Sequence, residues 1–179
     1  MWTSIEKLRE SSAREREGAA RLPLIGFHSD EGEYWIAIEQ EKDDGHPYAE
    51  LFLTKEEFII LALIGHQTQW ATDNQPGRDL GIGYGNWISS VEIADHETVQ
   101  STPRQVTTLV NRVIKKLEET HIEYLQEKVS LAEMFPNLIL KKRLGGYGKE
   151  PTGPFHFRFR ARCFSSSAET VSLSTVKQE

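Results

Sequence analysis

The sequence predicts an α+β fold in which strands come first, helices follow and a β-hairpin comes last. Three observations lead to this prediction. Residues 22–53 are rich in β-forming side chains and turn signals. Residues 54–65 and 102–117 change to the three- and four-residue spacing of helices, each behind a capping signal. Residues 138–164 alternate apolar and charged side chains after a Gly- and Pro-rich centre, which predicts a hairpin.

The length of 179 residues suits one domain with arms. Residues 1–21 predict a polar N-terminal arm or helix, because Ile5 and Leu8 are its only sizeable apolar residues after the first two positions. A helix that docks on a second copy is the alternative. Residues 22–164 make up the predicted domain, and residues 165–179 have the composition of a disordered tail.

The compartment is predicted from what the chain lacks. Cys163 is the single cysteine, so an internal disulfide is excluded and a reducing compartment is favoured. No apolar run approaches the roughly 18 residues of a membrane span, and the first residues lack the apolar region of a signal peptide. We therefore expect a cytoplasmic protein that does not contact membranes.

The strands at the start predict a meander or hairpin. "YWIAIEQE" at 34–41 is rich in β-formers, "DDGHP" at 43–47 is a turn cluster, and "YAELFL" at 48–53 alternates as a returning strand does. Thr54 then predicts a helix N-cap, with Glu57 completing a capping box. The helix that follows is apolar on nearly every side and should be central to the core.

The middle of the chain predicts a connection and two more helices. Residues 66–86 indicate a long polar, Gly-rich loop, and its G-x-G-x-G spacing lacks the flanking signals of a phosphate-binding loop. Residues 87–99 predict a short helix. Its expected core contacts are Ile88, Val91 and Ile93.

The strongest helix pattern begins at Thr102, the predicted N-cap, with Pro103 at the first helical position and Gln105 completing a capping box. Its apolar face is predicted to consist of Val106, Leu109, Val110, Val113 and Leu117, with Ile122 and Leu125 as an extension. Residues 130–137 indicate a short turn or helix that Pro136 closes.

The hairpin at 138–164 has a predicted first arm at 138–144 and a second arm that alternates cleanly. One face of the second arm is expected to be packed and the other solvated. The packed set is Phe155, Phe157, Phe159, Ala161 and Cys163, and the solvated set is His156, Arg158, Arg160 and Arg162.

Charged residues are distributed unevenly along the chain. It holds 21 Lys and Arg against 27 Asp and Glu, yet residues 104–162 hold 12 Lys and Arg against 6 Asp and Glu. The outward side of the 104–117 helix carries no acid before Glu118. Arg, Asn and Thr can read base edges in DNA, and Lys and Arg can neutralise phosphates. The candidate DNA-binding residues are Arg104, Thr107, Thr108, Asn111, Arg112, Lys115, Lys116, Lys141, Lys142, Arg143, Arg158 and Arg160.

Two simpler interpretations stay open. A helix with mixed charges is most often just a solvated face, and exposed Arg on a strand often only protects a sheet edge. Enzyme chemistry is not favoured: the six His are scattered without metal-ligand spacing, "ADHE" at 94–97 suits a polar helix surface, and Cys163 lies on the expected apolar face. We expect no cofactor, no metal and no catalytic site.

The order of elements predicts a winged helix-turn-helix with an N-terminal β-meander and a C-terminal β-hairpin wing. The sequence resembles the effector domain of the OmpR/PhoB-type regulators in three places: "LTKEEFIIL" at 53–61, "RQVTTLVNRVIKKL" at 104–117 and "LILKKRLGGYG" at 138–148. The resemblance implies that the 104–117 helix enters the major groove. It also implies roles by position: Thr108, Asn111 and Arg112 toward bases, Arg104 and Lys115 toward phosphates, and Arg143 toward the minor groove.

The chain departs from that family in several ways. Ile114 stands where another Arg is common, and Leu109 replaces a polar residue. The connections at 66–86 and 120–137 are longer, and the N-terminal arm is too short for a receiver domain. The expected function is a stand-alone, dimeric transcriptional regulator that binds double-stranded DNA. The alternatives are a replication-initiator-like or phage-type DNA binder, and a winged-helix module that contacts another protein through its acidic surface instead of DNA.

Overall fold

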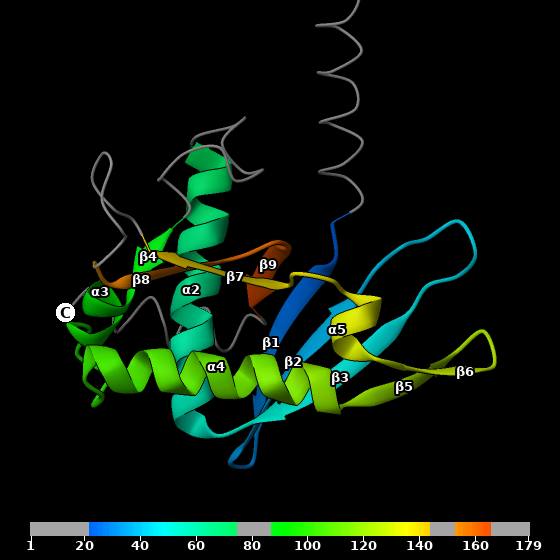
Figure 1. The fold of residues 1–179 in the computed structure, drawn as a ribbon, viewed down its shortest axis with the longest axis horizontal. Coiled ribbons are helices and arrows are strands. Elements are labelled where there is room, and N and C mark those ends of the chain that lie inside the picture. The colour runs from blue at the N-terminus through cyan, green and yellow to red at the C-terminus, as the bar shows by residue number, and fades with distance from the viewer. Residues whose placement is uncertain (1–21, 75–86, 144–152, 166–179) are drawn as a thin grey trace, which may run out of the picture.

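The computed structural model describes residues 22–74, 87–143 and 153–165, a mixed α+β structure with three sheets and four helices within those ranges (Figure 1). In chain order its elements are β1 (Leu24–Asp30), β2 (Glu33–Glu39), β3 (Tyr48–Leu53), α2 (Lys55–Asn74), β4 (Ile88–Ser89), α3 (Ser90–Ala94), α4 (Pro103–Glu119), β5 (His121–Tyr124), β6 (Glu127–Ser130), α5 (Leu131–Met134), β7 (Ile139–Arg143), β8 (Phe155–Phe159) and β9 (Arg162–Ser165). The predicted arm at 1–21 and most of the tail at 165–179 lie outside the described residues.

The first sheet has the strand order β3-β2-β1-β9. β1, β2 and β3 pair antiparallel in sequence order, which confirms the predicted meander. Glu31 and Gly32 turn the chain between β1 and β2 with φ angles of 49° and 82°, a conformation that glycine adopts at little cost. One face of this sheet is buried against α2, because Ile25, Ile36 and Leu51 expose 3% or less of their surface.

Helix α2 begins where the sequence predicts and ends later. The Thr54 amide donates to Glu57 Oε1 at 2.8 Å and the Glu57 amide donates to Thr54 Oγ1 at 3.2 Å, which confirms the capping box. The helix continues to Asn74, so the prediction of a loop from residue 66 is wrong for residues 66–74. Residues 75–86, with the glycine-rich motif, lie outside the described residues.

The extension of α2 is held by tertiary hydrogen bonds that no local pattern reveals. Buried Thr68 accepts a hydrogen bond from the Phe159 amide at 3.1 Å, and Gln69 Oε1 accepts one from the Cys163 amide at 3.1 Å. Polar residues that look like loop residues in the sequence therefore satisfy backbone groups of β8 and β9.

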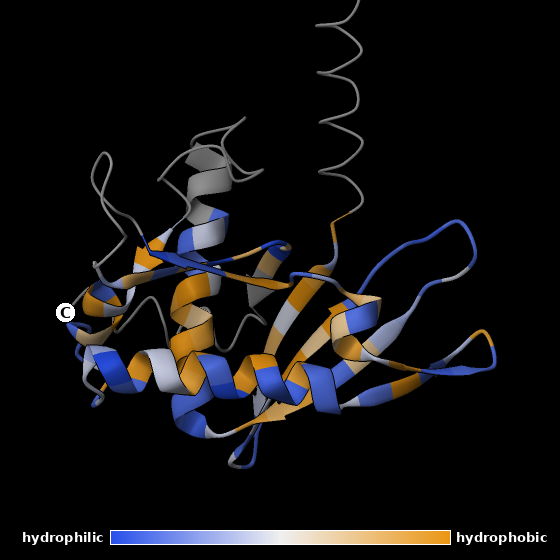
Figure 2. Ribbon diagram, in the orientation of Figure 1, coloured by the Kyte–Doolittle hydropathy of each residue, from blue (hydrophilic) through white to orange (hydrophobic). Residues whose placement is uncertain are grey.

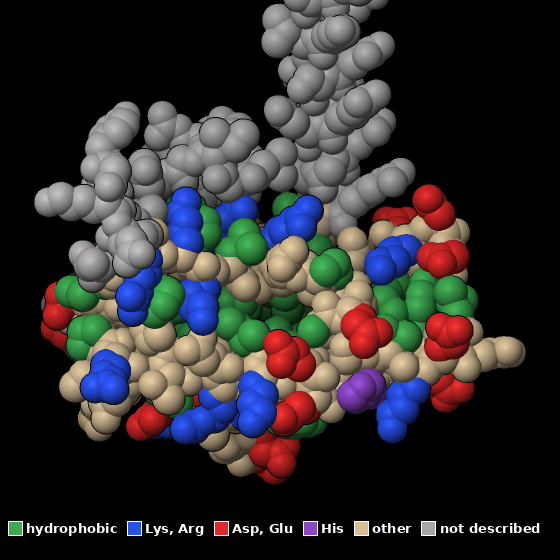
Figure 3. All heavy atoms as spheres, viewed as in Figure 1, with side chains coloured by type: hydrophobic (Ala, Val, Ile, Leu, Met, Phe, Trp, Pro, Cys, Tyr) green, Lys and Arg blue, Asp and Glu red, His purple; other side chains and the backbone are tan. Residues whose placement is uncertain are grey.

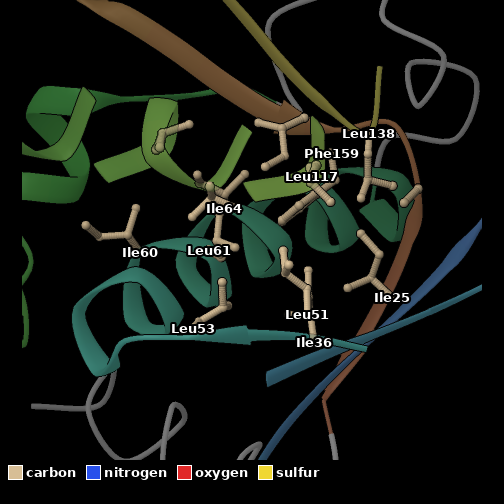
Figure 4. Packing of buried hydrophobic residues seen from close by; sticks show 14 of the residues in the cluster. Ile25, Ile36, Leu51, Leu53, Ile60, Leu61, Ile64, Leu117, Leu138 and Phe159 are labelled. Atoms are coloured by element: carbon tan, nitrogen blue, oxygen red, sulfur yellow. The ribbon is translucent and has the colours of Figure 1, made fainter. Parts of the chain in front are cut away.

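The core surrounds α2. Figure 2 shows hydrophobic residues over most of the first half of α2 and a narrower hydrophobic stripe along α4. The side chains of α2 lie between those of the first sheet on one side and those of α4 and β8 on the other (Figure 4). The residues labelled in that view are Ile25, Ile36, Leu51, Leu53, Ile60, Leu61, Ile64, Leu117, Leu138 and Phe159, all of them buried.

The replacement Gly65→Ala in α2 is expected to destabilise the fold by about 1–3 kcal/mol, the cost of overpacking a dense core. A Cβ at this position would lie 2.8 Å from Phe27 Cζ, and Phe27 is itself held edge-on by Phe58 and Phe159. The steric cost exceeds the gain of about 1 kcal/mol in helix propensity. Urea unfolding measures the change. In a Phe27→Leu background, which makes room, the same replacement should cost less, and an equal cost would refute this account.

The second sheet has the strand order β4-β8-β7. β7 and β8 pair antiparallel from Ile139↔Phe159 to Arg143↔Phe155, so the predicted hairpin forms over these residues. The hairpin does not continue to residue 164 as predicted, because β9 leaves it and pairs parallel with β1. The Arg160 amide still donates to Leu138 O at 2.9 Å, whereas the Arg162 amide donates to Pro23 O at 2.9 Å.

The prediction that Arg158 faces solvent is wrong. Its side chain is only 3% exposed, and its guanidinium lies 5.4 Å from the ring centre of buried Trp87. β4 pairs with β8 and places Trp87 beside it, which covers the face that the alternation alone suggests is solvated. Arg160 and Arg162 are exposed, but they lie at the crossing between the two sheets and not in one row with Arg158.

Helix α4 ends at Glu119, so the prediction that Ile122 and Leu125 extend it is wrong. These residues belong to a hairpin of β5 and β6, whose turn uses Leu125 and Gln126 at φ angles of 51° and 66°. The predicted short helix follows as α5, with Ser130 as its N-cap. The 120–137 segment is therefore a hairpin and one helical turn.

Candidate nucleic-acid interface

Helix α4 is held in place by a capping box at its N-terminus and by its buried apolar face, both as predicted. Thr102 Oγ1 accepts from the Gln105 amide at 3.3 Å, and Gln105 Oε1 accepts from the Thr102 amide at 2.8 Å. Pro103 occupies the first turn. The predicted apolar face is buried at every position, namely Val106, Leu109, Val110, Val113 and Leu117. Leu109 therefore belongs to the core.

The remaining side of α4 is polar and exposed. Arg104, Thr108, Asn111, Arg112 and Lys115 are all exposed, and α4 has no acidic residue before Glu118. The Thr108 hydroxyl donates to Arg104 O at 3.1 Å, so it is satisfied within the helix. The spacing of these residues places them along one side of the helix.

Two of the predicted residues on α4, Lys116 and Thr107, are less available than the sequence suggests, whereas Lys115 stays accessible. Lys116 Nζ forms a 2.6 Å ion pair with Oε1 of Glu57, whose side chain is buried. Thr107 is half-buried, and its hydroxyl donates to Pro103 O at 3.2 Å. Lys115 Nζ lies 3.8 Å from Glu119 Oε1, but both side chains are more than 60% exposed and the pair is weak. Lys116 is thus a link between α4 and α2.

Strand β7 brings a second set of cations to α4. Lys141 Nζ donates to Asn111 Oδ1 at 2.7 Å, which joins two predicted site residues 30 positions apart in the sequence. Lys141 Nζ lies 5.2 Å from the Phe155 ring centre, and the Arg143 guanidinium lies 4.3 Å from it. Aromatic rings hold cations in this way while leaving the charged group accessible.

Lys142 lies in a different environment from Lys141. Its Nζ lies 4.3 Å from the ring centre of Trp87, which also holds Arg158. Successive residues of a strand point to opposite faces, so Lys142 does not share the side on which Lys141 contacts α4. The predicted DNA-binding residues therefore do not all lie on one side of the structure. We define the basic face as the exposed cations of α4 and β7: Arg104, Arg112, Lys115, Lys141 and Arg143.

Acidic residues are concentrated in a different part of the molecule. Residues 24–53, which span β1 to β3, hold eight Asp and Glu and a single Lys. Figure 3 shows blue Lys and Arg side chains over α4 and β7, and mainly red Asp and Glu side chains toward the β2–β3 connection and the β5–β6 hairpin. Such a separation creates a positive field on one side of the molecule that favours an anionic partner.

Three further observations concern metal ions, cavities and membranes. Among the described residues, no group of three or more His, Cys, Asp or Glu is placed to hold a metal ion. A cavity of about 170 Å³ is bordered by Lys55, Ile59, Val99 and Ser101, and it is smaller than the roughly 300–1,000 Å³ of usual ligand pockets. No helix in the described ranges is long and apolar enough to cross a bilayer.

Cys163 should not react with thiol reagents while the protein is folded. It is 5% exposed, as the sequence predicted, and burial raises the pKa of its thiol, so the nucleophilic thiolate is disfavoured. An Ellman assay of the native protein should show almost no reaction, and the same assay in denaturant should show one thiol per chain. Rapid reaction of the native protein would contradict the buried position of β9.

Comparison of the chain with protein-family models, with curated proteins and with solved structures gives no match. The basis for a functional assignment is therefore the geometry and the charge of the chain itself.

Proposed function

We propose that this protein binds double-stranded DNA in a sequence-specific manner through a winged helix-turn-helix, with α4 in the major groove and the β7–β8 hairpin against the backbone. The single observation that carries the proposal is the contact between Lys141 and Asn111, because it unites the hairpin with the exposed side of α4. Cations from both elements then form one basic face.

The order of elements supports the winged-helix assignment. α2, β4, α3 and α4 are followed by β7 and β8, and β8 lies between β7 and β4 in the second sheet. A short strand between the first two helices that pairs with the hairpin is the arrangement we expect of a winged helix. α3 and α4 pack against each other, as the two helices of a helix-turn-helix must.

The chemistry of the basic face suits groove binding. The Arg112 guanidinium could donate two hydrogen bonds to guanine, and the Asn111 amide could pair with adenine after releasing Lys141. Arg104, Lys115 and Lys141 would then neutralise phosphates. Arg143 lies at the end of β7, where a minor-groove contact by the wing would begin. Lys116 and Arg158 are left out of this mechanism, because both are committed to contacts within the protein.

In cellular terms, we propose a transcriptional regulator that works in the cytoplasm as a homodimer. A second candidate function is an interaction module that binds another protein instead of DNA. The observation that favours it is the acidity of β1 to β3, which would repel a duplex approaching from that side. A replication-initiator-like or phage-type role would use the same groove-binding mechanism on a different site.

Titration of labelled mixed-sequence duplex DNA at several salt concentrations tests the proposal. The logarithm of the binding constant should fall linearly with the logarithm of salt, with a slope of about −3 to −5 if most of the cations of the basic face meet phosphates. Absence of binding at low salt would exclude the DNA-binding function and favour the interaction module.

A further inference from the structure

The outer face of the first sheet carries a row of aromatic side chains. His28 of β1, Trp35 of β2 and Phe52 of β3 are in register across the three strands. The His28 and Trp35 rings are stacked with centres 5.7 Å apart, and the Trp35 and Phe52 rings lie 5.9 Å apart at 41°. We call these three residues the aromatic row.

The aromatic row faces away from the core. Phe27, Ile36 and Leu51, which alternate with its members along the strands, are all buried against the opposite side. Phe52 is 56% exposed, and Tyr48 on the same strand and face is 50% exposed. Contiguous exposed patches of large apolar side chains often mark interaction sites.

Carboxylates border the aromatic row on its own face. Positions two residues apart on a strand share a face, which places Asp30 beside His28, Glu33 beside Trp35 and Glu50 beside Phe52. All three acids are exposed. Glu50 Oε1 accepts a hydrogen bond from the Tyr48 hydroxyl at 2.8 Å.

We propose that this face is a docking site for an arginine-rich segment of another protein. A guanidinium can lie flat on Trp35 or Phe52 and direct its N–H groups to the neighbouring carboxylates, so ring stacking and ion pairing act on the same side chain. Arginine can do both at once because its guanidinium is planar, whereas the lysine ammonium is a compact charge that cannot stack flat on a ring. The proposal does not depend on the DNA-binding function, because it uses none of the residues of the basic face.

The charge of this face favours an arginine-rich segment over a second copy of the chain and over single-stranded nucleic acid. A symmetric contact between two copies would bring together two β1–β3 regions, residues 24–53, that each hold eight acids and one Lys, and like charges repel. A single-stranded nucleic acid could stack on the aromatic rings, but binding of that kind requires a positively charged groove, and here the surroundings are negative.

Binding of a short oligo-arginine peptide to the full chain tests the proposal, with oligo-lysine and oligo-glutamate of the same length as comparison peptides. We expect oligo-arginine to bind, oligo-lysine to bind more weakly and oligo-glutamate not to bind. Phe52→Ser should weaken oligo-arginine binding by about fivefold, the value of an exposed cation–π contact. Glu50→Gln should also weaken it. Glu41→Gln, which removes an exposed acid outside the strands, should have little effect.

Two results would overturn the docking site. If Phe52→Ser binds oligo-arginine as tightly as the wild type, or if Glu41→Gln weakens binding as much as Glu50→Gln, the attraction is a diffuse charge effect. If oligo(dT) binds and Phe52→Ser abolishes that binding, the face is a stacking platform for nucleic acid. The duplex-DNA affinity of Phe52→Ser should equal that of the wild type, which separates this test from that of the basic face.

Discussion

Arg112→Ala should weaken binding to a specific DNA duplex by roughly 1–3 kcal/mol, which corresponds to about 5- to 150-fold in affinity. Arg112 is exposed on α4 between Asn111 and the buried Val113. Its side chain makes no ion pair with any described residue, so its loss should affect the complex and not the fold. Fluorescence anisotropy with a selected duplex measures the change, after the preferred sequence has been obtained from a random pool.

Lys128→Ala is the matched control for this experiment. Lys128 is an exposed cation of β6, and it lies outside the basic face. Removing it changes the net charge by the same amount as Arg112→Ala does, so a general electrostatic attraction would respond equally to both. If the two variants lose equal affinity for the duplex, or if Arg112→Ala loses none, the proposal that α4 binds in the major groove is wrong.

Glu57→Ala should lower the free energy of unfolding by about 2–3 kcal/mol, between the cost of one unsatisfied buried group and that of a broken buried ion pair. Glu57 is 1% exposed, caps α2 through the Thr54 amide, and holds Lys116 of α4 at 2.6 Å. Water reaches the Lys116 side chain, which is 32% exposed, and this access reduces the cost. Thermal unfolding should show a melting temperature lower by about 5–10 °C.

The neighbouring Glu56→Ala is the control, because Glu56 is exposed in the same helical turn. It should change stability by no more than about 0.5 kcal/mol. Lys116→Met combined with Glu57→Met removes both charges and should restore part of the lost stability, since apolar pairs can replace buried ion pairs. If Glu57→Ala costs no more than Glu56→Ala, then the pair does not hold α4 to α2.

The parts of the fold that were predictable from sequence are those fixed by neighbouring residues. The capping boxes at Thr54 and Thr102 depend on side chains three positions away, and both form as predicted. The buried face of α4 follows from helical spacing alone. The loop predicted at 66–86 is wrong for residues 66–74, because Thr68 and Gln69 are held by strands about 90 residues later in the chain.

The candidate site was predictable in its composition but not in its arrangement. Residue type and spacing identified exposed cations on α4, and the structure adds that Lys141 reaches Asn111. Nothing local distinguishes Lys116, which is bound to Glu57, from Lys115. Arg158 was misassigned because Trp87, 71 positions earlier, covers its face of β8. The aromatic row could not be predicted from the sequence, because its members come from three strands and become neighbours only through the strand register.

A backbone amide NMR titration of the full chain with duplex DNA tests most directly whether α4 and β7 bind DNA. We expect the largest shift changes in α4 from Arg104 to Lys115 and in β7 from Lys141 to Arg143. The amides of Trp35 and Phe52, on the outer face of the first sheet, should hardly move. Shift changes that centre on the first sheet, or no changes at low salt, would contradict the proposed DNA-binding face.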